Sequence, residues 1–138
     1  ILGDPVGRRI QSELQEQSRP DQGSVMVVAA TDIPLTCRQL RRVLKRAAVG
    51  LARTGSYFGH GSGDVFLGFC TVNRMKSEGR MPLALNCLPE ECMDDVFRLM
   101  AEAVEEAVLN SLTEAHPAEY LNGRICHSLA EFLLPEKR

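Results

Sequence analysis

The run SVMVVAATD, residues 24–32, constrains the fold of this 138-residue chain more than any other feature. It is almost continuously apolar and rich in β-branched side chains, which is typical of a strand covered on both faces. A second run of this kind, VFLGFCTVN, occupies residues 65–73. We therefore expect two buried strands, and we expect the first of them to lie centrally in a sheet and not at its edge.

Two amphipathic helices are expected to accompany these strands. Thr36 followed by Gln39 is a capping-box pattern, and apolar residues then recur at helical spacing up to Gly55. A longer periodic stretch runs from about Pro89 to Leu112, and LALNCL just before it has the character of a short strand. The alternation of strand, helix, strand and helix predicts a layered α/β fold.

The two ends of the chain are expected to be less regular. ILGDPVG and the polar stretch that follows it up to Gly23 predict a strand end, a turn and an exposed linker. At the other end, HSLAEFLL at residues 127–134 predicts a short helix. We therefore divide the chain into an N-terminal segment, residues 1–23, and a main segment, residues 24–138, within a single domain.

The overall composition limits the classes of partner. A hydrophobic content of 44% suffices for one ordinary domain with a core, and the formal net charge of −2 argues against nucleic acid or an anionic membrane as main partner. No apolar stretch reaches the roughly 18 residues of a membrane span, and no signal peptide is visible. Because the chain starts at Ile1 and not at Met, we expect a fragment, with the cytoplasm as its compartment and the periplasm as the alternative.

The cysteines do not predict a cross-link or a metal site. They are five in number, unevenly spaced and without a CxxC pair, which is typical of neither a disulfide framework nor a zinc site. We expect reduced and mostly buried thiols, and no residue cluster suggests a metal or an organic cofactor. The five are Cys37, Cys70, Cys87, Cys92 and Cys126.

The junction between Gly23 and Ser24 is the first stretch that could carry chemistry. Ser24 heads the first expected strand, where its hydroxyl can face a cleft at the strand end. If Ser24 Oγ attacked the Gly23 carbonyl and water hydrolysed the resulting ester, Ser24 would gain a free α-amine, which is partly neutral at physiological pH. That amine could serve as a base beside the hydroxyl. The pair alone, however, favours a plain boundary between a loop and a strand.

The second stretch is the glycine-rich loop GHGSGD, residues 59–64. Its glycines do not follow the G-x-G-x-x-G spacing, and Ser62 lacks the G-x-S-x-G frame of a nucleophile elbow. His60 is more readily interpreted as an incidental loop residue than as a catalytic one. The hydroxyl of Ser62 and the carboxylate of Asp64 remain, directly before an expected strand, and they fit either a second face of an active site or a simple turn.

Taken together, four stretches resemble a known family in order and spacing, from residue 1 to about 112. These stretches are GDPVG, GSVMVVAATDIPLTCRQLRRVLKRAAVGLARTGS, GHGSGDVFLGF and EEAVLN. The chain resembles the self-processing L-aminopeptidase/D-esterase and β-peptidyl aminopeptidase family. The resemblance implies an α-β-β-α sandwich similar to that of N-terminal nucleophile hydrolases, of which this chain would hold only the C-terminal part.

The resemblance also implies roles for individual residues. The bond between Gly23 and Ser24 would be the site of self-cleavage into an α and a β chain, with Ser24 as the nucleophile. Ser62 and Asp64 would help to position the nucleophile and the amine of the substrate. Family members often have Glu where Asp64 stands, so the shorter side chain departs from the usual pattern.

The activity implied by the resemblance is that of a serine-type aminopeptidase, amidase or esterase. It would release N-terminal amino acids from small peptides, amides or esters, as an oligomer of αβ units and without a cofactor. The family's α chain is much longer than residues 1–23 and supplies a tyrosine and an asparagine of the oxyanion site, so we expect activity to need the missing α-chain region. Two alternatives are a self-processing acyltransferase of the ornithine acetyltransferase type, whose nucleophile is threonine, and an inactive fragment or interaction module.

Overall fold

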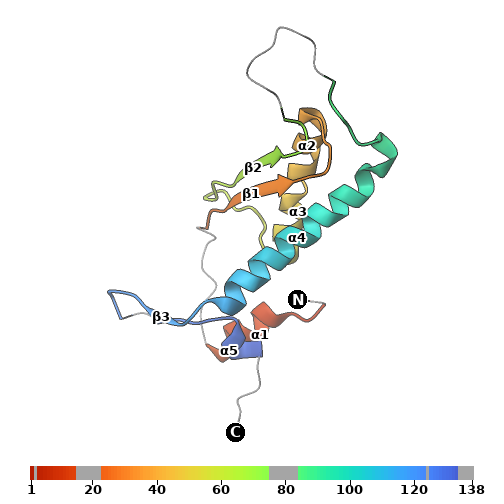
Figure 1. The fold of residues 1–138 in the computed structure, drawn as a ribbon. Helices are drawn as coiled ribbons and strands as arrows, with labels where there is room; N and C mark the ends of the chain where they lie inside the picture. The colour runs from red at the N-terminus through yellow and green to blue at the C-terminus, as the bar shows by residue number, and fades with distance from the viewer. Residues whose placement is uncertain (2, 15–22, 75–83, 124, 134–138) are drawn as a thin grey trace.

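The computed structural model describes residues 1, 3–14, 23–74, 84–123 and 125–133 (Figure 1). Its helices are α1 (Val6–Glu13), α2 (Cys37–Leu44), α3 (Ala47–Arg53), the 3₁₀ helix η1 (Glu90–Cys92), α4 (Met93–Glu114) and α5 (Ala130–Leu133). Its strands are β1 (Met26–Thr31), β2 (Val65–Cys70), β3 (Ala118–Glu119) and β4 (Ile125–Cys126).

The strands β1 and β2 form a parallel pair, in which Met26 lies opposite Val65 and Thr31 opposite Cys70. Both expected strands therefore exist at the expected places. Helices α2 and α3 connect them, since parallel strands need a crossover and not a tight turn. Helix α2 packs against β2, and α4 packs against both α2 and α3, as Figure 1 illustrates.

Each of the two strands is covered on one face only, so the expectation of complete burial is wrong. Exposed and half-buried residues alternate along both strands. Met26 is 71% exposed and Phe69 is 52% exposed, whereas Val27 and Phe66 pack against the hydrophobic core. Among the described residues β1 pairs with β2 alone, which also contradicts the expected central position. The exposed faces of β1 and β2 also carry apolar side chains, which explains why the sequence pattern predicted burial on both faces.

The single helix expected up to Gly55 is in fact two helices. Lys45 and Arg46 form a turn between α2 and α3, and the N–H of Arg46 donates to the carbonyl of Val43 at 2.8 Å, a tight bond of 3₁₀ type. Both helices bury apolar side chains in the same core. The apolar spacing therefore continues across the turn and does not reveal the break.

The longer helix expected from Pro89 to Leu112 is confirmed as η1 followed by α4. Its apolar stripe forms much of the core, with Met93, Met100 and Val104 buried. Helix α3 approaches α4 very closely at Gly50, where an added Cβ would lie 2.5 Å from the carbonyl oxygen of Ala101. This crossing therefore requires a residue without a side chain. The buried core cluster consists of Leu35, Val43, Ala47, Leu51, Met93, Val96, Met100 and Val104.

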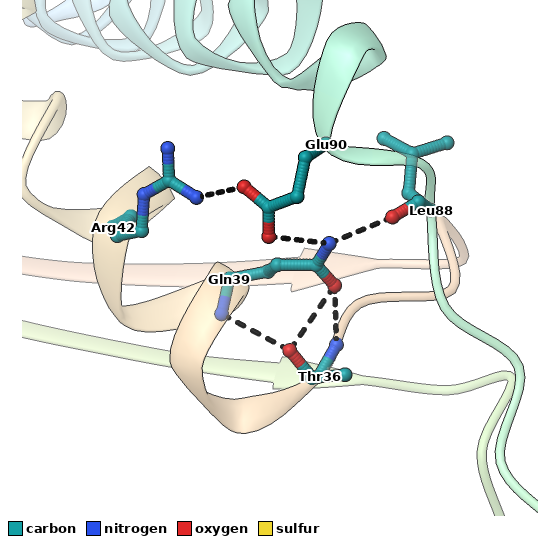
Figure 2. Close-up of polar contacts among 5 residues, drawn as sticks. All are labelled: Thr36, Gln39, Arg42, Leu88 and Glu90. Atoms are coloured by element: carbon teal, nitrogen blue, oxygen red, sulfur yellow. Dashed lines mark hydrogen bonds and ion pairs between the residues drawn. The ribbon is translucent and has the colours of Figure 1, made fainter.

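Gln39 joins the start of α2 to the segment that leads into η1 (Figure 2). The N–H of Gln39 donates to Thr36 Oγ at 3.2 Å and the N–H of Thr36 donates to Gln39 Oε1 at 3.0 Å, which confirms the capping box. Gln39 Nε2 donates to the Leu88 carbonyl at 2.7 Å and to Glu90 Oε1 at 3.4 Å. Glu90 also pairs with Arg42, whose hydrogen bond lowers the pKa of the Glu90 carboxyl.

The expected short strand at residues 83–88 is wrong for residues 84–88, and residue 83 lies outside the described residues. Individual hydrogen bonds hold this segment instead. The N–H of Leu88 donates to the Pro34 carbonyl at 2.7 Å, and Asn86 and Asn73 exchange two bonds of 3.0 and 2.8 Å. Residues 84–88 are thus held in place without being part of a sheet.

The strand end that we expected in the N-terminal segment is wrong, and residues 15–22 of the expected linker are not among those that the structure describes. Residues Val6–Glu13 form helix α1. Val6 is only 4% exposed, while the polar residues of α1 lie on its exposed side. A polar composition here reflects the outer face of a helix.

The C-terminal part contains the expected short helix, as α5, and a small antiparallel pair of β3 and β4 that we did not expect. The N–H of Leu129 donates to the carbonyl of Leu112 at 2.9 Å, which attaches the start of α5 to the end of α4. Ser128 is buried, and its N–H donates to Glu131 Oε1 at 2.7 Å. Residue 134 of the expected helix lies outside the described residues.

Candidate active site

The candidate site lies where the first residues of β1 and β2 meet. The register of the parallel pair offsets the two strands by 39 residues, because Met26 lies opposite Val65. Continued backwards by two positions, the same offset brings Ser24 opposite Gly63. The N–H of Val65 donates to the Val25 carbonyl at 2.9 Å, so the ladder does extend beyond β1 toward Ser24.

Ser24 itself is exposed and bonded to the glycine-rich loop. The backbone N–H of Gly63 donates to Ser24 Oγ at 3.0 Å. A serine oxygen can accept this bond and still donate its own proton elsewhere. The hydroxyl is therefore held at one position while its proton remains available for transfer.

Asp64 connects the two sides of the site through both of its carboxylate oxygens. Oδ1 accepts the N–H of Val25 at 3.1 Å, and Oδ2 accepts the hydroxyl of Ser62 at 2.8 Å. Asp64 and Ser62 are half-buried. The carboxylate thus braces the backbone directly after Ser24, and Ser62 in turn holds the carboxylate.

All three residues that we predicted as catalytic are therefore close in space. Ser24, Ser62 and Asp64 form one group, in which Ser62 takes part through Asp64. Gly23 is exposed beside Ser24, and His60 is exposed in the turn that the N–H of Ser62 closes by donating to the Gly59 carbonyl at 2.9 Å. Their catalytic roles remain predictions.

Sequence reasoning missed the amide of Gly63. Backbone donors have no signature of their own, and Gly63 stood out only as one of several glycines. The signal that could have found it is the pairing of the two apolar runs in parallel, which aligns the residues before them as well.

The loop that carries Gly63 and Asp64 is anchored at its start. Gly55 follows α3 with a φ of +107°, and Phe58 has a φ of +55°, which is uncommon for a residue other than glycine. The side chain of Phe58 packs against the hydrophobic core. The loop therefore leaves the core at a fixed point before it reaches Ser24.

A groove of about 850 Å³ lies between β1 and α4, and neither Ser24 nor Asp64 is among its lining residues. Its β1 side includes every residue from Val25 to Thr31, and its α4 side includes Leu99, Ala103 and Ala107. The groove thus includes Val25, the residue next to Ser24, and its lining is mostly apolar, with Thr31 and Ser111 as polar exceptions.

The cysteines do not have the burial that we expected. Cys37 and Cys87 are exposed, and the other three are half-buried. The thiol of Cys70 donates to the Ile33 carbonyl at 3.1 Å, and a backbone hydrogen bond from Leu35 lowers the pKa of that thiol. The expectation of mostly buried thiols is therefore wrong.

Within the described part of the chain, no group of three or more His, Cys, Asp or Glu residues is arranged to hold a metal ion. None of the helices found in those residues combines the length and the apolar character needed to cross a membrane.

Comparison with known proteins places the chain in a family. The profile of peptidase family S58 matches residues 1–126. The β-peptidyl aminopeptidase BapA of Sphingosinicella microcystinivorans is 31% identical over 156 residues, an alignment that covers 100% of this chain and 39% of the relative.

Solved structures agree with this family. A protein from Pyrococcus horikoshii OT3 is 41% identical with a TM-score of 0.81, and the alignment covers 96% of this chain and 36% of the relative. A second solved structure is that of the L-aminopeptidase D-Ala-esterase/amidase of Ochrobactrum anthropi, described as a prototype for the serine aminopeptidases and a variant of the Ntn hydrolase fold. It is 32% identical with a TM-score of 0.79, and the alignment covers 96% of this chain and 37% of the relative. The chain thus spans well under half of these relatives, and the expected fold class is confirmed. The chain belongs to peptidase family S58 and has the α/β architecture of the N-terminal nucleophile hydrolases.

Proposed function

We propose that this chain supplies the nucleophile of a serine-type, self-processing aminopeptidase that also cleaves amides and esters. The observation that supports it best is the environment of Ser24, whose Oγ accepts the Gly63 amide at 3.0 Å. Beside it, the Asp64 carboxylate holds the N–H of Val25 at 3.1 Å. A nucleophilic hydroxyl is activated by an adjacent base, and the proposed base is the α-amine that self-cleavage would give to Ser24.

The first step of the proposed mechanism is self-cleavage. Ser24 Oγ attacks the carbonyl carbon of Gly23, the peptide C–N bond breaks, and the proton of the hydroxyl passes to the Ser24 nitrogen. Water then hydrolyses the ester, which frees the Gly23 carboxylate and leaves Ser24 with an α-amine. Gly23 suits this step because a residue without Cβ leaves its carbonyl open to attack.

Turnover then uses the same hydroxyl. The neutral amine of Ser24 takes the hydroxyl proton, Oγ attacks the substrate carbonyl, and the leaving amine or alcohol carries the proton away. Water hydrolyses the acyl-enzyme and restores Ser24. Asp64 is suited to hold the ammonium group of the substrate, because its carboxylate lies at the backbone N–H of Val25, the residue next to the nucleophile.

The proposed substrates are small peptides, amides or esters with a free amino group. The relatives are named β-peptidyl aminopeptidase and L-aminopeptidase D-Ala-esterase/amidase, which supports this class. We further propose that the α-chain region expected from the family resemblance provides the oxyanion donors, and that αβ units associate into an oligomer. No cofactor takes part in the proposed mechanism.

The test uses the full-length precursor. We expect incubation to give two chains, the second beginning at Ser24, together with hydrolysis of aminoacyl p-nitroanilides. Ser24→Ala should remain uncut and inactive, while Ser12→Ala, which changes an exposed serine of α1, should behave like the unaltered protein. A precursor that stays uncut, with activity that survives Ser24→Ala, would refute the proposal. A protein that folds and binds a partner without hydrolysis would favour an interaction module.

A further inference from the structure

We infer that the backbone N–H of Gly63 is a positioning donor for the nucleophile, acting in both self-cleavage and turnover. This inference rests on the proposed function, because it assigns a role at the same oxygen. The N–H of Gly63 contacts Ser24 Oγ at 3.0 Å. It is a group of the main chain, distinct from the side chains of Ser62 and Asp64 already assigned.

The contact selects one orientation of an otherwise exposed side chain. An exposed serine samples three staggered rotamers, and a hydrogen bond to Oγ favours the one that reaches the donor. Because the bond occupies one lone pair, the second lone pair and the hydroxyl proton remain available for attack and proton transfer. The nucleophile is thus oriented before the substrate arrives.

The residues that follow the donor are held by the pairing of the two strands. The N–H of Val25 donates to Asp64 Oδ1 at 3.1 Å, and the N–H of Val65 donates to the Val25 carbonyl at 2.9 Å. Gly63 directly precedes these two bonded positions, so its amide cannot turn away without disturbing them. Donors fixed in this way need no reorganisation when charge develops.

The donor can stabilise negative charge on Ser24 Oγ at two steps of the proposed reaction. Negative charge develops on Ser24 Oγ as the proton leaves during each attack, and again when the acyl-enzyme breaks and Oγ is the leaving group. An N–H at 3.0 Å from Oγ is placed to stabilise both states. It acts on the nucleophile oxygen and not on the carbonyl oxygen, so it is separate from any oxyanion donor.

The space around Gly63 allows a small side chain without loss of the donor. A Cβ added to Gly63 would meet Ser24 Oγ at 3.6 Å, an ordinary van der Waals contact. A methyl group would therefore fit at this position. The N–H of Gly63 can therefore be tested with Gly63→Ala, which retains the donor.

The experiment removes the N–H in the full-length precursor. Gly63→Pro deletes the donor, and glycolic acid incorporated at position 63 replaces the N–H with oxygen without adding a ring. We expect both to lower the self-cleavage rate and kcat by roughly tenfold to a hundredfold, the loss of one hydrogen bond to a charged oxygen. KM should change little, because the donor does not touch the substrate.

Comparison variants separate this effect from simple disturbance of the loop. Gly63→Ala retains the N–H and measures the effect of bulk alone, so it should lose less than Gly63→Pro. Glycolic acid at Gly61 measures the effect of an ester bond in the same loop. In a Ser24→Cys background the loss caused by Gly63→Pro should shrink, because a thiolate forms more readily than an alkoxide.

The outcomes distinguish the two proposals. If the position-63 ester cleaves itself and turns over at the normal rate while Ser24→Ala is inactive, the role of Gly63 is wrong and the proposed function stands. If Ser24→Ala stays active, the proposed function fails. Should Gly63→Pro not fold, the position-63 ester decides, since it leaves the side chain and the chain length unchanged.

Discussion

The carboxylate of Asp64 accepts the backbone N–H of Val25 at 3.1 Å, although the two residues are 39 positions apart in the sequence. Val25 directly follows Ser24, so the bond attaches the glycine-rich loop to the backbone of the candidate nucleophile. The second carboxylate oxygen is held by the Ser62 hydroxyl at 2.8 Å. The loop and the strand end therefore form one unit.

Replacing Asp64 tests the importance of its charge. Asp64→Asn keeps an oxygen for the N–H of Val25 but loses the negative charge, so we expect kcat/KM in the full-length protein to fall by about tenfold or more. Asp64→Glu keeps the charge and should lose less. Equal activity of Asp64→Asn and the unaltered protein, measured with an aminoacyl p-nitroanilide, would contradict a role for the charge.

Ser62→Ala removes one hydrogen bond from Asp64 and leaves the Val25 bond in place. A single bond of this kind contributes about 1 to 3 kcal/mol, so we expect a partial loss of kcat that is far smaller than that of Ser24→Ala. Steady-state kinetics on Ser62→Ala and Ser24→Ala measures which variant loses more kcat. If Ser62→Ala is as inactive as Ser24→Ala, Ser62 acts on the nucleophile more directly than through Asp64.

Gly50→Ala should destabilise the protein through the crossing of α3 and α4. The new methyl group would lie 2.5 Å from the Ala101 carbonyl oxygen and 2.8 Å from Val104 Cβ, so the helices must separate. We expect a loss of about 1 to 3 kcal/mol in the free energy of unfolding. Gly7→Ala in α1, with nothing within 4 Å of the new Cβ, is the matched control and should be neutral or slightly stabilising. Denaturant titration of both variants measures the difference, and equal effects would contradict the close packing at Gly50.

Gln39→Ala should destabilise the protein without changing the chemistry at Ser24. Gln39 is only 3% exposed, and its loss would leave the Leu88 carbonyl and the Thr36 N–H without these partners. Unpaired buried groups of this kind cost about 1 to 3 kcal/mol each. Gln11→Ala, on the exposed side of α1, is the control. A melting temperature for Gln39→Ala equal to that of the control would show that the bonds of Gln39 drawn in Figure 2 contribute little.

The pairing of Glu90 with Arg42 predicts a dependence of stability on pH. Because the folded state lowers the pKa of Glu90, its contribution is present above the ordinary glutamate pKa and is lost as the pH falls through the lowered value. Thermal melting of the unaltered protein and of Glu90→Gln should therefore differ at neutral pH and converge in acid. A difference that stays constant between neutral and acidic pH would exclude this contribution.

The sequence predicted the main elements well because their apolar patterns are strong. Residues 24–32 and 65–73 do contain strands, and the periodic stretch near Met100 is a helix. Burial was predicted poorly, since an apolar side chain such as that of Met26 reads the same whether or not another layer covers it. The turn at Lys45 was missed because both helices face one core.

The site was predictable as far as its side chains carry a recognisable pattern. Ser24 and Asp64 were singled out from their own stretches, the family resemblance then implied their roles, and they are close in space. The Gly63 amide was not predictable in this way, because its position follows from the register of the strands and not from its side chain.

The offset between β1 and β2 also sets an order of events. The Gly63 amide and the Asp64 carboxylate reach the Ser24 region only after the strands have paired in this register, in which Met26 lies opposite Val65. In an unfolded chain the bond before Ser24 is an ordinary peptide bond with no partner near it. If scission depends on these contacts, it cannot precede assembly of the sheet, and the appearance of a new amino terminus would serve as a chemical record that the chain has folded correctly.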